Sequence, residues 1–202
     1  MDSASGETPR QTVVCEISDT GFMDGIEIRQ ILQLLEIQNG NGVNDALSKT
    51  AETAGLIVRN GLVARLVMLV SRVFGTPRED DLQVGRAFEL LKEPAVLNEI
   101  RTRGPSGSVD DAIATWQRLK SDPRLPKLKQ FRDKFTAHLG KPNPQIARLK
   151  SNELVSFAHE TTVLLDKLAR ATGAREQRLD AWDYQLKEAA EAFWKPWMHP
   201  TG

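Results

Sequence analysis

Apolar residues recur along most of the chain at the spacing of an α-helix, three or four positions apart. No stretch alternates apolar and polar residues for long enough to predict a β-strand. The ten prolines and most of the glycines fall between the helical segments, where they mark turns. The pattern therefore predicts an all-α fold, a multi-helix bundle without an internal repeat.

Two long helices are predicted in the first part of the chain. The first covers residues 23–38, places Ile28, Ile31, Leu32 and Leu35 on one side, and ends at the Asn-Gly-Asn-Gly run of residues 39–42. Asn44 would cap the second helix, which runs to about Phe74. Residues 1–20 are polar and irregular apart from residues 12–17, so we expect a flexible N-terminal arm there and a single helical domain over 21–202.

Shorter helices are predicted in the rest of the chain, over residues 80–92, after Pro94, and over 108–120. Pro123 and Pro126 open the next helix, which carries an apolar stripe and ends at Gly140; the stripe consists of Leu128, Phe131, Phe135 and Leu139. Two last helices are expected over 151–172 and from 174 to about 194, where Pro196 would end the second. Residues 173–202 thus form a C-terminal helix and an aromatic tail.

Cys15 is the only cysteine, so no intrachain disulfide can form and a cysteine-based metal site lacks partners. The N-terminal residues contain neither a basic patch nor an apolar run that would indicate a secretory signal. We therefore expect a cytoplasmic protein with no metal and no other cofactor.

The most apolar stretch, residues 56–74, is long enough to raise the question of a membrane span. Arg59, Arg65 and Arg72 interrupt it, and each would cost roughly 2.5–3.5 kcal/mol near the middle of a bilayer. A buried central helix of a protein outside the membrane is the preferred interpretation.

Positive charge is concentrated between residues 118 and 150, although the whole chain has 27 basic and 27 acidic residues. This segment, here called the basic band, holds ten Lys and Arg residues against Asp122 and Asp133, a net charge of +8. Such a band can bind phosphates even on a neutral protein, and a solvated helix face is the alternative.

Known phosphate-loop, zinc-protease and dinucleotide motifs are absent, which leaves the three histidines as candidates for proton transfer. His159 is interpreted as a helix-surface residue and His199 as part of an exposed tail. His138 falls in the last turn of its predicted helix, where free carbonyls favour the imidazolium form. A histidine with a pKa near neutrality can act as an acid or a base.

Arg132 lies six residues before His138, which on an α-helix corresponds to about 9 Å of rise and about 120° of rotation. The two side chains would not stack on one face, but both could reach a shared phosphate. A guanidinium suits this role because it is planar, always charged and able to bind two phosphate oxygens.

The segment RDKFTAHL at residues 132–139 resembles the Arg-polar-x4-His motif of the HEPN superfamily. The helix that ends LVSRVFGTP, the motif helix after PRLPKL, and the SNELVSFAHETTVLLDKLARATG helix resemble the AbiU2-like branch of that superfamily. The likeness covers roughly residues 45–172. It implies an up-and-down four-helix core with extra helices.

The resemblance also implies a metal-independent endoribonuclease of toxin-antitoxin or phage-defence systems, in which the motifs of two subunits meet in a homodimer. Arg132 would stabilise charge on the phosphate, His138 would act as base or acid, and Asp133 would orient one of them. We expect Lys129, Lys134 and Lys141 to bind RNA, and a cognate antitoxin as a further partner.

Two alternatives remain open. The protein could be a catalytically inactive helical module for dimerisation or binding, in which Arg132 and His138 have structural roles. The aromatic tail at residues 193–197 could stack on bases or dock a partner, but packing of the last helix on the bundle is preferred.

Overall fold

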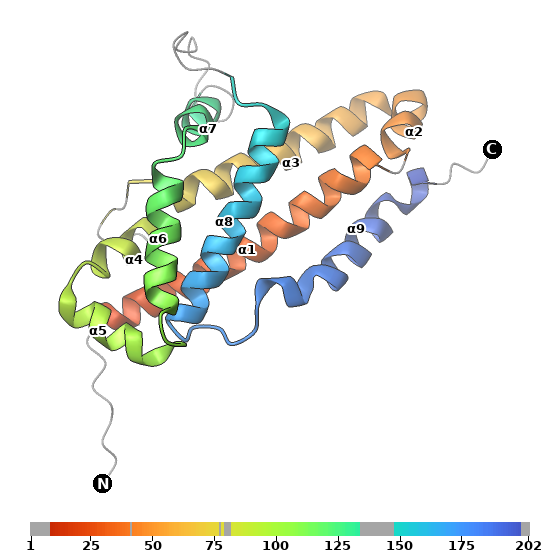
Figure 1. Ribbon diagram of the computed structural model, residues 1–202. Coiled ribbons are helices and arrows are strands. Elements are labelled where there is room, and N and C mark those ends of the chain that lie inside the picture. The colour runs from red at the N-terminus through yellow and green to blue at the C-terminus, as the bar shows by residue number, and fades with distance from the viewer. Residues whose placement is uncertain (1–8, 41, 77, 79–81, 134–147, 199–202) are drawn as a thin grey trace.

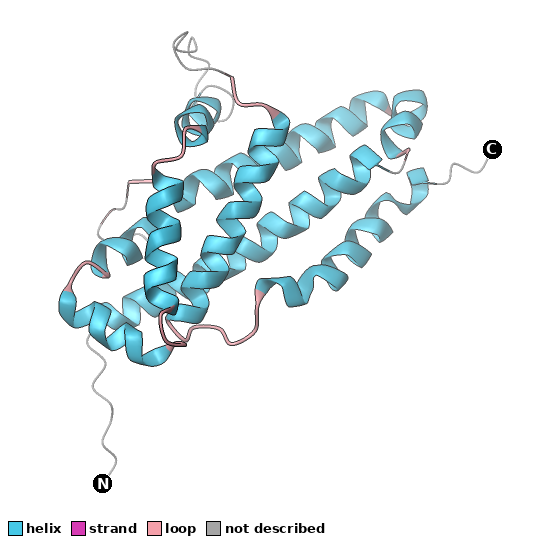
Figure 2. Cartoon of the chain, in the orientation of Figure 1, coloured by secondary structure: helices cyan, strands magenta, loops and turns pink. Residues whose placement is uncertain are grey.

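The computed structural model describes residues 9–40, 42–76, 78, 82–133 and 148–198. All regular structure in these ranges is helical, which confirms the all-α prediction (Figure 2). The elements are α1 (Pro9–Gly40), α2 (Val43–Thr50), α3 (Glu52–Val73), α4 (Val84–Leu90), α5 (Pro94–Arg103), α6 (Ser108–Lys120), α7 (Arg124–Arg132), α8 (Ser151–Ala171), the 3-10 turn η2 (Leu179–Trp182) and α9 (Asp183–Met198).

The long helix α1 runs through the middle of the molecule and packs against α3, α4, α8 and α9 (Figure 1). Along the chain, α1, α3, α6 and α8 alternate in direction, so they form an up-and-down bundle. The helix α9 covers one flank of α1, and α7 lies across the end of α3 and against α8. The predicted multi-helix bundle is therefore correct.

The predicted N-terminal arm is wrong for residues 9–20, because α1 begins at Pro9. Val14 and Ile17 are fully buried and continue the apolar stripe of the helix toward its N-terminus. Gly21 and Gly25, which by pattern alone suggest an interruption, are sites of close packing instead. A Cβ atom at Gly25 would lie 2.7 Å from Leu179 Cδ1, so glycine at this position allows η2 to approach α1 closely.

The second predicted helix is divided in two by Ala51, whose φ of −152° and ψ of 42° are not helical. Asn44 is not the capping residue either: α2 is preceded by Gly42, whose φ of 70° lies in the left-handed region. The chain turns between α2 and α3, and Leu47 packs against Gly55.

The buried apolar side chains of α3 lie in its C-terminal half. Leu66, Val67, Leu69, Val70 and Val73 belong to the core, whereas Leu56 is 51% exposed, Ile57 67% and Met68 46%. Within the described residues α3 alone has the length and apolar composition to cross a membrane. The prediction of a buried central helix therefore holds for one half and fails for the other.

A cluster of stacked aromatic rings ties the end of α3 to α4, α6 and α8. The ring of Trp116 stacks on Phe74 at 5.3 Å and on Phe88 at 4.6 Å between centroids, and Phe74 also contacts Phe157. These contacts are strong for their area because offset aromatic stacking adds to apolar burial. They fix the end of α3, where the candidate site lies.

The C-terminal helix begins later than predicted, at Asp183, and continues through Pro196 to Met198. Pro196 lies two residues before the end of α9, so the hydrogen bond that its missing N–H removes weakens only the last turn. Trp194 is 1% exposed and its Nε1 donates a hydrogen bond of 2.9 Å to the carbonyl of Leu34. This confirms that the last helix packs on the bundle through Trp194.

Candidate functional site

The motif segment begins at the end of α7. Leu125 and Leu128 are buried and hold this helix on the bundle, and Phe131 is half-buried. The other two members of the predicted stripe, Phe135 and Leu139, lie outside the described residues. Arg132 is the last residue of α7 and Asp133 follows it as the C-cap.

Arg124, at the start of α7, anchors the helix to α8. Its guanidinium donates hydrogen bonds to Asp122 at 2.7 and 2.9 Å, to Glu160 at 2.7 Å and to Ser156 at 3.1 Å. It also lies 5.0 Å from the ring centroid of Phe157, a cation–π contact. These hydrogen bonds raise the pKa of Arg124 and lower that of Asp122.

Other members of the basic band also bind carboxylates. Arg118 donates to Glu160 at 2.5 Å, and Lys127 donates to Glu153 at 2.6 Å. Burial acts to raise the pKa of Glu160, but the hydrogen bonds from the two arginines outweigh it and the pKa is lowered. The net charge of +8 therefore overstates the charge that this segment offers to a phosphate, because acidic residues of α8 neutralise part of it.

The guanidinium of Arg132 is held by its neighbour in the motif. Its Nε donates a hydrogen bond of 2.8 Å to Asp133 Oδ1, and Nη2 lies 2.6 Å from the same oxygen. The Arg132 side chain remains 31% exposed. Asp133 thus fixes the direction of a guanidinium that stays accessible from outside.

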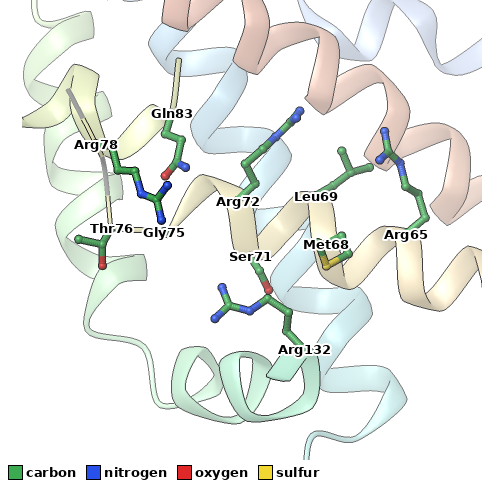
Figure 3. Close-up of a pocket in the computed structure, with 10 residues that line it drawn as sticks. All are labelled: Arg65, Met68, Leu69, Ser71, Arg72, Gly75, Thr76, Arg78, Gln83 and Arg132. Carbon is green, nitrogen blue, oxygen red and sulfur yellow. The ribbon is translucent and has the colours of Figure 1, made fainter. Parts of the chain in front are cut away.

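Arg132 borders a cavity of about 420 Å³ between α7, the C-terminal half of α3 and the segment after it (Figure 3). Four arginines line it, and none of the described lining residues is acidic; the lining residues are Arg65, Met68, Leu69, Ser71, Arg72, Gly75, Thr76, Arg78, Gln83 and Arg132. Guanidinium groups are the side chains best suited to bind phosphate. The cavity is therefore a candidate anion site.

Two of these arginines are bound to carboxylates of α1. Arg65 forms a bidentate pair with Glu27 at 2.6 and 2.8 Å, and its hydrogen bonds lower the pKa of that carboxyl. Arg72 pairs with Asp24, where Nε lies 3.0 Å from Oδ2. Burial raises the pKa of Asp24 and exceeds the opposite effect of Arg72. The α1 carboxylates thus hold these two arginines in place at the cavity wall.

The structure describes only part of the predicted site. Arg132 and Asp133 are brought together, and Lys129 is half-buried one turn earlier on α7. His138, Lys134 and Lys141 lie outside the described residues, and so does His199. His159 is exposed on α8, as predicted.

Sequence reasoning missed Arg65, Arg72 and Arg78 as neighbours of Arg132. A signal was present, because residues seven apart lie on one helix face and Arg65 and Arg72 have this spacing. In the sequence alone, these arginines argue only against membrane insertion. Their proximity to Arg132 depends on how α7 packs on α3, which local pattern does not reveal.

No group of three or more His, Cys, Asp or Glu is placed to hold a metal ion within the described ranges. The architecture defines a helical-bundle protein with an arginine-lined cavity at the end of α3. Residues 25–193 match the AbiU2 family of HEPN domains, so the chain belongs to the HEPN superfamily, AbiU2 branch. Neither a curated protein nor a solved structure matches the chain.

Proposed function

We propose that this protein is a metal-independent endoribonuclease of the HEPN type that cleaves RNA through its Arg/His motif. Arg132 stabilises negative charge on the scissile phosphate, and His138 transfers the proton. Asp133 orients Arg132 through the hydrogen bond between them. The observation that carries the proposal is the position of Arg132, the first residue of the motif, at the edge of an arginine-lined cavity in a HEPN-family chain.

The chemistry suits these residue types because RNA carries its own nucleophile. His138 removes the proton from a 2′-OH, which attacks the adjacent phosphorus while the bond to the 5′-oxygen breaks. The leaving oxygen takes up a proton from an acid, and the products are a 2′,3′-cyclic phosphate and a 5′-OH. Arg132 donates hydrogen bonds to the phosphoryl oxygens and stabilises the negative charge that develops on them, as preorganised donors do in other phosphoryl transfers.

The active form in this proposal is a homodimer, because each motif contributes one histidine and the reaction uses a base and an acid. An exposed face of α3 supports such an assembly. It consists of the exposed Ala54, Ile57, Gly61 and Met68 and the half-buried Ala64, alternately three and four residues apart, and Met68 also lines the cavity. A second copy bound to this α3 face would lie beside the cavity and near the motif.

Lys129, Lys134 and Lys141 bind the RNA backbone around the motif in this proposal. The protein acts in the cytoplasm as part of a toxin-antitoxin or phage-defence system, and a cognate antitoxin restrains it. Membership of the AbiU2 family supports this assignment.

A catalytically inactive helical module is the second candidate. The carboxylate pairing of Arg118, Arg124 and Lys127 favours it, because these residues hold α6, α7 and α8 together and are not spare RNA contacts. In this case Arg132 and Asp133 form a structural ion pair.

Incubation of the purified protein with single-stranded RNA in EDTA separates the two candidates. The nuclease proposal predicts cleavage that Arg132→Ala and His138→Ala each reduce by at least about a hundredfold. Absence of cleavage, or equal cleavage by the variants, would support the inactive module.

A further inference from the structure

Ser71 of α3 is a buried hydroxyl that faces the arginine-lined cavity without a hydrogen-bond partner. The residue is 1% exposed and it lines the cavity. Figure 3 shows its side chain directed from α3 toward Arg132. A buried polar group without a partner costs folding free energy, and a ligand that accepts a hydrogen bond from it would remove that cost.

Other buried hydroxyls on the helices of this chain are satisfied within their own helix. Ser18 donates to the carbonyl of Val14 at 2.6 Å, and Thr161 donates to that of Phe157 at 2.8 Å. Ser71 occupies the same kind of position and makes no such bond. Its hydroxyl therefore has no acceptor among the described residues.

Positive charge surrounds this hydroxyl. Arg78 and Arg132 extend toward the middle of the cavity from opposite sides, whereas Arg65 and Arg72 turn toward α1 (Figure 3). Within the described ranges, Glu27 pairs with Arg65, Asp24 with Arg72 and Asp133 with Arg132. Each of the two α1-bound guanidiniums uses Nε and Nη2 for its carboxylate.

The cavity is also large enough for more than one small group, since its volume falls within the range of about 300–1,000 Å³ that is usual for ligand sites. Most of its lining side chains are long, and rotamer changes of such side chains can make room for an anion. The lining is too polar and charged to favour an apolar ligand.

We propose that this cavity is a second phosphate subsite, in which Ser71 and Arg78 bind the RNA phosphate next to the one that Arg132 contacts. The inference rests on the proposed function for the identity of the polymer. It adds a site outside the Arg/His motif that positions the RNA strand and carries no part of the proton transfer.

The test measures binding of a fully 2′-O-methylated single-stranded oligoribonucleotide, which lacks the attacking hydroxyl, to the full chain by fluorescence anisotropy at several salt concentrations. Ser71→Ala is expected to weaken binding by about tenfold, the usual effect of one hydrogen bond to a charged group. Its melting temperature should not fall, because no hydrogen bond of the folded protein is lost. Arg78→Gln should weaken binding and lower the salt slope by about 0.7, the share of one phosphate contact.

Arg59→Gln is the matched control, since Arg59 lies on α3 outside the cavity. It should leave affinity and salt slope close to those of the wild type. Wild-type affinity in both Ser71→Ala and Arg78→Gln would overturn the proposal. So would displacement of the oligonucleotide by equimolar AMP, because the site would then serve free nucleotides.

Cleavage and binding distinguish this inference from the proposed function. If the wild type binds through Ser71 and Arg78 but never cleaves RNA, the subsite stands and the nuclease assignment fails. If the wild type cleaves RNA and both variants bind normally, the nuclease assignment stands and the subsite fails.

Discussion

Arg124 of α7 and Glu160 of α8 form an ion pair in which Nη2 lies 2.7 Å from Oε1. The same Nη2 lies 2.7 Å from Asp122 Oδ2, so a single guanidinium joins two carboxylates. The pair fixes the beginning of α7, and the motif lies at the end of the same short helix. Arg124, one of the basic residues near the motif, therefore serves to position the helix that carries Arg132.

Replacement of Arg124 by methionine should destabilise the protein by about 1–3 kcal/mol, because it leaves the partly buried Asp122 without its side-chain donor and removes one of the two arginines that bind Glu160. Urea unfolding measures the change. Arg101→Met is the control: Arg101 pairs with Asp110 at the surface, and its loss should cost less than about 1 kcal/mol. Equal effects of the two substitutions would contradict the anchoring role of Arg124.

The ion pairs of Arg124 with Asp122 and Glu160 should also affect how the stability of the protein depends on pH. The pKa values of Asp122 and Glu160 are lowered in the folded protein, so the stability they contribute is present above their unfolded pKa and is lost as pH falls through the lower folded pKa. Glu160→Gln should therefore reduce the loss of unfolding free energy between about pH 5 and pH 2 relative to the wild type. An unchanged acid slope would show that Glu160 is not stabilised as an anion.

The sequence predicted the later helices better than the first one. The helix α6 begins at Ser108 and ends at Lys120, as predicted. Its first turn carries acidic residues and its last turn basic residues, which is the distribution that the helix dipole favours. The helix α1 was predicted too short because Gly21 lies on its apolar stripe just before the predicted start, and the stripe also includes the polar Asp24 within the predicted helix. Both are buried for tertiary reasons: Gly21 lies against α8, and Asp24 accepts hydrogen bonds from Arg72 of α3.

The charge of the candidate site was harder to predict than its location. Arg132 and Asp133 were identified from local sequence, and the structure joins them by a hydrogen bond. The carboxylates that neutralise Arg118 and Lys127 lie on α8, 42 and 26 residues away in sequence. A count of charges along one segment cannot include such partners, which depend on helix packing.

The C-terminal aromatic residues differ in burial, and this difference yields a prediction. Trp194 is buried and bound to Leu34, so Trp194→Ala should cost about 3–5 kcal/mol of unfolding free energy. Phe193 is 49% exposed and makes an edge-to-face contact with Trp194, so Phe193→Ala should reduce the unfolding free energy much less. Thermal unfolding compares the two, and a folded protein of wild-type stability after Trp194→Ala would contradict the packing role.

The exposed face of α3 predicts the assembly state. Ile57→Glu should convert the proposed dimer to a monomer in sedimentation experiments without loss of helix content, because the side chain is 67% exposed in the single chain. Val163→Glu, on an exposed position of α8, should leave the dimer intact. A monomeric wild type, or dissociation by Val163→Glu alone, would contradict assembly through α3.

The central claim is cleavage of RNA through Arg132 and His138, and the product ends test it most directly. A chimeric strand that carries a single ribonucleotide among 2′-O-methyl residues is incubated with the protein in EDTA, and the fragments are analysed by mass spectrometry. We predict a single cut on the 3′ side of that ribonucleotide, a 2′,3′-cyclic phosphate and a 5′-OH, and at least about a hundredfold slower reaction with His138→Ala or Arg132→Ala. Cutting at 2′-O-methyl positions, a 3′-OH end, or full activity of either variant would contradict it.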